Sequence, residues 1–95
     1  MAAYILAFVD VTDAETYERY KQLAPPAIAA GGGRYLVRGG AVEVLEGSHD
    51  GRRVVVLEFP DIAAAKAFYD GEAYREARAV RAPASKATLL LVPGI

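Results

Sequence analysis

Three short segments of the chain are apolar at nearly every position, namely residues 4–9, 54–57 and 89–92. They are rich in β-branched and aromatic residues, which favours strands. In an antiparallel sheet with one face exposed to solvent, every second residue is polar. In these segments the odd-numbered and the even-numbered residues are both apolar. We therefore expect strands whose two faces are both covered.

Between the first two strands, the pattern changes to helical spacing. Thr12 and Glu15 have the spacing of a capping box, so a helix is expected from about Asp13. Its apolar positions recur at three- and four-residue steps. They are Tyr17, Tyr20, Ala24, Ala27 and Ile28. Pro25-Pro26 predicts a kink or a restart near residues 23–26, and the glycines at 31–33 end the element.

The middle of the chain is expected to form one long, bent β-ribbon. Residues 34–38 form a strand, Gly39-Gly40 marks a bulge or bend, and residues 42–46 continue in extended form. The Gly- and Asp-containing stretch at 47–51 is typical of a hairpin loop, and residues 53–59 supply an antiparallel partner.

Two helical pieces and a last strand complete the order. Asp61 is a candidate cap for a helix through about Tyr69. Asp70 is a candidate cap for a second piece through about Ala82, which Pro83 stops before a strand over 87–92. The order βαββ(α)αβ is that of an α+β, ferredoxin-like split βαβ sandwich, with an antiparallel sheet and helices on one face. We expect one such domain over residues 1–95, and a homodimer in which a second copy covers the open sheet face.

Composition narrows the classes of partner. Eleven Lys and Arg against twelve Asp and Glu give a net charge of −1, so bulk charge suggests neither nucleic acid nor an anionic membrane. No apolar run reaches the roughly 20 residues that span a bilayer. The absence of cysteine removes disulfides, thiol catalysis and thiolate metal sites. We expect a cytoplasmic protein without nucleic-acid or membrane partners.

Arg34 and Glu58 are the polar residues that fit their apolar strands least, so burial would demand a partner for each. One interpretation is a catalytic pocket in which the guanidinium binds a substrate carboxylate or enolate and Glu58 acts as a base. The other is a structural ion pair at a strand end or dimer contact.

Aromatic and basic residues on the helices are candidate ligand contacts. Tyr74, Arg78 and Arg81 follow i, i+4, i+7 spacing and could clamp an anion, or they could form a solvated helix face. Tyr17 and Tyr20 could line an aromatic pocket between helices and sheet, or simply pack in the core.

The remaining candidate chemistry is sparse. His49 is the single histidine and lies in a glycine-flanked loop, where solvent exposure is expected. Without cysteine or a second histidine, a zinc-type metal site is not expected. We expect no metal and no cofactor.

Several segments together resemble one family, the domain of unknown function 1330 of the dimeric α+β barrel superfamily. The most specific segments are residues 17–20, 33–40, 56–60 and 67–69, with Tyr74 and Arg78. The resemblance covers nearly the full chain and implies a ferredoxin-like protomer in a dimer whose sheets form a barrel. It brings no established reaction with it.

Two functions follow as hypotheses. One is a small dimer that binds or transforms a small aromatic or carboxylate-bearing metabolite, by cofactor-free oxygenation or proton transfer. The alternative is a non-catalytic binding or structural homodimer. They differ in whether the candidate residues converge on an open cavity.

Overall fold

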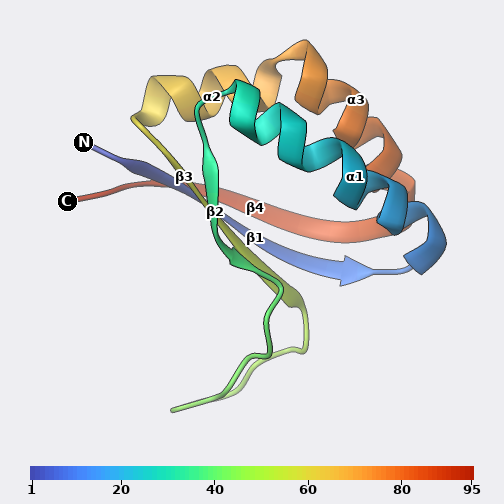
Figure 1. The fold of residues 1–95 in the computed structure, drawn as a ribbon. Coiled ribbons are helices and arrows are strands. Elements are labelled where there is room, and N and C mark those ends of the chain that lie inside the picture. The colour runs from blue at the N-terminus through green and yellow to red at the C-terminus, as the bar shows by residue number, and fades with distance from the viewer.

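Four antiparallel strands form one sheet in the computed structural model, which describes residues 1–95 (Figure 1). The strands are β1 (Ala3–Val11), β2 (Arg34–Arg38), β3 (Arg53–Phe59) and β4 (Ser85–Pro93). Their order in the sheet is β2-β3-β1-β4, and every neighbouring pair is antiparallel. This is the split βαβ topology of the ferredoxin-like α+β fold that the order of apolar segments predicted.

The helices α1 (Ala14–Ala30), α2 (Ile62–Asp70) and α3 (Glu72–Arg81) lie together over one face of the sheet (Figure 1). A short turn of 3₁₀-helix, η1 (Ala82–Ala84), leads from α3 into β4. None of the helices combines the length and the apolarity that crossing a membrane requires.

Two of the expected helix caps differ from the structure. Asp13, rather than Thr12, caps α1, because its carboxylate accepts a hydrogen bond from the Thr16 N–H at 3.2 Å. Asp61 caps α2 as expected, accepting from the Ala64 N–H at 2.7 Å. Asp70 does not cap α3, since α2 continues through it and α3 begins after Gly71 without a side-chain cap.

Pro25 and Pro26 lie inside α1, and the helix runs through them as one element of 17 residues. The expected restart is therefore wrong. A proline at position 25 has no N–H to donate to the carbonyl of Lys21, four residues earlier. Arg38 of β2 replaces that donor, because its Nη2 donates to the Lys21 carbonyl oxygen at 3.1 Å. A contact from another element thus satisfies the backbone group that proline leaves free.

The long ribbon expected after β2 is also wrong. Residues 39–52 form an exposed loop that projects from the sheet (Figure 1). β3 begins only at Arg53, so residues 42–46 have no strand to pair with. The bulge lies within β2, between Tyr35 and Val37, rather than at Gly39-Gly40. Gly39 instead turns the chain with a φ of +71°, a conformation that favours glycine.

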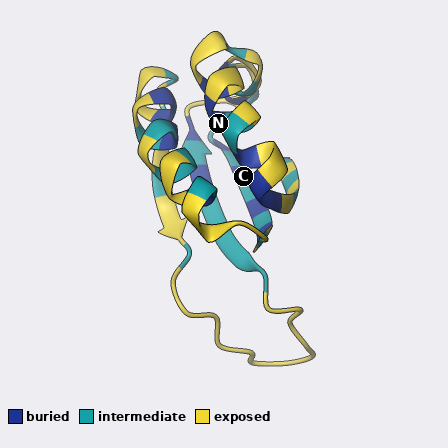
Figure 2. Ribbon diagram, turned by 90° about the vertical axis from the view of Figure 1, so that its right-hand side faces the viewer, coloured by how far each residue is buried: buried dark blue, intermediate teal, exposed yellow.

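The core lies between the sheet and the helices, where the buried residues of the two layers face each other (Figure 2). Alternate residues of β1 from Ala3 to Val9 are buried on this side. Phe59 of β3 is 1% exposed, and its ring centroid lies 4.9 Å from that of Phe68 in α2. Ala77 of α3 is fully buried in this core, where its small side chain lets neighbouring elements pack closely.

The opposite face of the sheet, which we call the open face, is apolar as well. Leu6 of β1 lies opposite Val56 on one side and Leu90 on the other. Leu90 is 47% exposed and Val92 is 40% exposed, because no element of the same chain covers them. The apolar residues therefore belong to two different faces. One face packs against the helices, and no part of the same chain covers the other.

Replacing Phe59 by alanine tests the packing of the core. We expect Phe59→Ala to lower the free energy of unfolding by about 3 to 5 kcal/mol, since the ring leaves a cavity that its neighbours fill only in part. Leu45→Ala is the control, because Leu45 is 91% exposed in the loop. Urea unfolding followed by circular dichroism, at one protein concentration, measures both. Equal losses in the two variants would contradict the assigned core.

Candidate functional site

A cavity lies between the helices and the sheet, and tyrosines and cationic side chains make up its polar lining. Of its 16 lining residues, 12 are hydrophobic. The tyrosines among them are Tyr17, Tyr20, Tyr35 and Tyr74. The free volume is about 30 Å³. At roughly 10–15 Å³ for each water molecule, this space holds two or three of them. A ring-sized ligand therefore enters only if side chains of the lining move.

The phenols of the cavity form a packed group. The hydroxyl oxygens of Tyr20 and Tyr74 lie 2.8 Å apart in a hydrogen bond. The ring centroids of Tyr17 and Tyr20 are 5.3 Å apart, and Tyr74 packs on Phe68 at 4.5 Å. Burial raises the pKa of Tyr17, Tyr20 and Tyr35 above the ordinary value for tyrosine. These phenols are therefore protonated near neutral pH and can donate hydrogen bonds.

Three guanidinium groups also border the cavity, from Arg38, Arg53 and Arg81. Arg81 is only 8% exposed, and the Nε atoms of Arg53 and Arg81 are buried without a hydrogen-bond partner. None of the three pairs with a carboxylate, and the lining contains no Asp, Glu or His. The cavity thus presents positive charge and hydrogen-bond donors, without an internal counter-ion.

Two residues of the cavity lining join α1 to β2. They are Lys21 of α1 and Arg38 of β2, and Arg38 donates a hydrogen bond to the Lys21 carbonyl. The Arg38 guanidinium also lies 4.6 Å from the ring centroid of Tyr35. Lys21 forms an ion pair with Glu18 at 2.9 Å. A ligand that entered between α1 and β2 would break the hydrogen bond between Arg38 and the Lys21 carbonyl.

Among the candidate ligand residues predicted from the sequence, the structure brings Tyr17, Tyr20 and Tyr74 to the cavity and leaves Arg78 apart. The Arg78 guanidinium lies instead 4.5 Å from the ring centroid of Tyr69. At 3.6 residues per turn, position i+7 lies about 20° from position i, whereas i+4 lies about 40° away. Tyr74 and Arg81 therefore share the inward face of α3 more closely than Tyr74 and Arg78.

Arg34 and Glu58 contact each other but do not reach the cavity. The Arg34 Nε and Nη2 atoms both lie 2.7 Å from Oε1 of Glu58, and the Arg34 side chain is 70% exposed. Glu58 pairs in register with Tyr4, next to the buried Ile5, so the pair lies on the open face. The Arg34 hydrogen bond holds the pKa of Glu58 below its usual range. The sheet separates this pair from the tyrosines.

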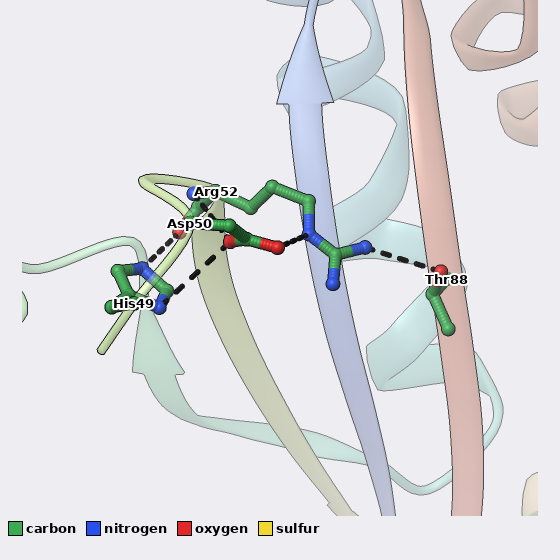
Figure 3. A network of polar contacts seen from close by, with 4 residues as sticks. All are labelled: His49, Asp50, Arg52 and Thr88. Carbon is green, nitrogen blue, oxygen red and sulfur yellow. Dashed lines mark hydrogen bonds and ion pairs between the residues drawn. The ribbon is translucent and has the colours of Figure 1, made fainter. Parts of the chain in front are cut away.

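His49 belongs to a polar network that fastens the loop to β4 (Figure 3). Its Nε2 lies 2.9 Å from the Arg52 carbonyl oxygen. Arg52 Nε donates to Asp50 at 2.7 Å, and its Nη1 donates to the Thr88 hydroxyl at 3.2 Å. Nowhere in the chain do three His, Asp or Glu side chains gather in a group that could hold a metal ion. This network acts as a structural tie for the loop.

The sequence analysis missed Arg38 and Arg53 as cavity residues. A signal for Arg53 exists, because alternation from the buried Leu57 through Val55 places it on the helix-facing side of β3. For Arg38 the same reasoning fails, because the bulge at Leu36 shifts the alternation of β2 by one residue.

Comparison with solved structures shows the same fold in several proteins. A protein of unknown function from Rhodopseudomonas palustris is 23% identical, with a TM-score of 0.77 over 99% of this chain and 82% of that one. SnoaB, a cofactor-independent oxygenase from Streptomyces nogalater, is 12% identical, with a TM-score of 0.64 over 99% and 93%. A dimeric protein of unknown function from Bacteroides fragilis is 13% identical, with a TM-score of 0.58 over 98% and 96%.

The search of curated proteins finds no match. The sequence model of one family matches residues 2–95, which is nearly the whole chain. Together with the ferredoxin-like topology, this match shows that the chain belongs to the family described as Domain of unknown function (DUF1330).

Proposed function

We propose that this protein is a cytoplasmic homodimer that binds a small aromatic metabolite in the cavity between its helices and its sheet. The observation that carries the proposal is the lining of that cavity, in which four tyrosines surround a space between the helices and the sheet. Aromatic side chains provide flat apolar contacts for a ring, and their hydroxyls provide a small number of placed donors.

The chemistry of the lining favours binding over proton abstraction. A general base must accept a proton near the working pH, and Asp, Glu and His are absent from the cavity. Tyr17, Tyr20 and Tyr35 are poor bases because burial raises their pKa and keeps them protonated, and the arginines are always charged. SnoaB is described as a cofactor-independent oxygenase. Because this cavity contains no Asp, Glu or His, the same chemistry here would need a ligand that loses its proton without a carboxylate or imidazole base.

The open face supports the homodimer. Its apolar residues lie on neighbouring strands of the sheet, and leaving them in water forfeits the free energy that burying them would provide. The neighbour from Bacteroides fragilis with the same fold is described as dimeric. Two sheets packed through these faces would enclose the apolar side chains in a barrel.

A charged substitution on the open face tests the dimer. We expect the protein to sediment at roughly twice its chain mass of 10.1 kDa at micromolar concentration. Leu90→Asp should sediment as a single chain, since the carboxylate would be buried without a partner in the interface. Leu45→Asp, in the exposed loop, should remain dimeric. A wild-type protein that sediments at the mass of one chain would overturn this part of the proposal.

Ligand-induced stabilisation tests the cavity. Among 4-methylphenol, 4-hydroxybenzoate and 1,4-dihydroxynaphthalene, we expect at least one to raise the melting temperature by about 5 °C or more when present at about 100 times its Kd. Val55→Phe, which fills the cavity, should abolish the response, whereas Val42→Phe in the loop should retain it. Oxygen uptake with the bound probe separates an oxygenase from a non-catalytic binder. If no probe stabilises the protein, or if Val55→Phe responds like wild type, the cavity is not the site.

The Arg34–Glu58 pair is predicted to act in stability rather than in ligand binding. Because the pKa of Glu58 is lowered in the folded protein, the stabilisation is present above its unfolded pKa, near 4.5, and is lost as the pH falls through the folded value. We expect Glu58→Gln to melt below wild type at pH 7, and the gap to close as the pH falls from 4.5 through the lowered pKa of Glu58 in the folded protein. Thermal melts across pH measure this. A loss of the ligand response in Arg34→Ala would assign the pair to the site instead.

A further inference from the structure

We propose that Arg53 and Arg81 form a subsite for a carboxylate, so that the cavity selects an aromatic carboxylate over a neutral aromatic compound of the same shape. This inference rests on the proposed function, since it concerns the same cavity. It adds the chemical class of the ligand and the two residues that recognise it.

The first support is the burial of Arg81 at the end of α3. Its side chain is among the few polar groups in the core, at 8% exposed, and its Nε has neither an acceptor nor access to water. Burying a charged group without a counter-ion destabilises a protein unless some other interaction compensates for the lost hydration. An anion in the cavity would supply that interaction once the side chains that shield the Nε move aside.

The second support is that Arg53 approaches the same place from the sheet. It is the first residue of β3, and its Nε is also buried without an acceptor. The Arg53 guanidinium lies 6.0 Å from the ring centroid of Tyr17, and the Arg81 guanidinium lies 5.8 Å from that of Tyr20. Since these two rings are 5.3 Å apart, both cations border one pair of tyrosines.

Backbone geometry also accommodates Arg53. The Arg53 guanidinium lies against the backbone at Gly39, where a side chain would compete with it for space. The φ of +71° at Gly39 independently favours glycine. The Gly39 N–H donates a hydrogen bond to the Val54 carbonyl at 2.9 Å. Glycine at this turn therefore leaves free the space that the Arg53 guanidinium occupies.

The available donors and space fit a carboxylate. Two Nε–H groups lack acceptors, and a carboxylate has two oxygens that accept strong, charge-assisted hydrogen bonds. The free volume of about 30 Å³ takes the carboxylate, and the ring would lie against the mostly apolar lining once side chains there move aside. A free phosphate would leave that apolar lining without contacts.

The test compares two probes of nearly equal shape, 4-hydroxybenzoate and 4-hydroxybenzamide, by isothermal titration calorimetry. We expect the wild-type protein to bind the carboxylate at least tenfold more tightly than the amide. Arg81→Gln should remove this preference. Arg78→Gln, a matched change on the same helix but outside the cavity, should keep it. Arg53→Gln provides a second variant and should also remove the preference.

The possible outcomes separate this inference from the proposed function. Equal affinity for the two probes in the wild-type protein would overturn the carboxylate subsite and leave the aromatic site standing. Binding of neither probe would overturn both. Competition by inorganic phosphate at the same concentration as 4-hydroxybenzoate would overturn the carboxylate class. A preference that survives in both Arg81→Gln and Arg53→Gln, with far-ultraviolet circular dichroism unchanged, would overturn the assignment of the residues.

Discussion

A sheet that is apolar on both faces needs a cover on each side, and most features of this protein follow from that constraint. One face carries the helices, which bury alternate residues of β1 and the ring of Phe59. The other face leaves Leu90 and Val92 partly in water. The helix face therefore contains the cavity, and the open face is where a second chain would pack.

The helix-covered face holds both the packed core and the cavity. Ala77 of α3 is fully buried in the core. Phenols and guanidiniums, among them those of Arg81 and Arg53, line the space that remains between the layers. A buried cation without a counter-ion usually reduces the stability of the fold. On the proposed function, a bound carboxylate would supply the counter-ion that Arg81 lacks.

Local irregularities in the sequence are resolved by contacts between distant elements. Pro25 removes a donor from α1, and the Lys21 carbonyl that it leaves free binds Arg38 of β2. Gly39 turns the chain directly after β2, next to the Arg53 guanidinium. Both irregularities thus lie beside arginines that line the cavity, Arg38 in the first case and Arg53 in the second. A proline in a helix and a glycine after a strand, which look like interruptions in the sequence, thus shape the site.

The sequence by itself determined the order of the elements, the ferredoxin-like fold and the inward positions of Tyr17 and Tyr20, because these depend on periodicity within short segments. Only the tertiary structure decided that residues 39–52 form a loop, since that depends on where β3 begins and on the lack of a pairing partner. It also decided that Arg34 and Glu58 pair on the open face and that Tyr74, Arg53 and Arg81 line the cavity. Strand register, a bulge and packing between layers determine which side chains meet, and none of these is encoded by the spacing within one segment.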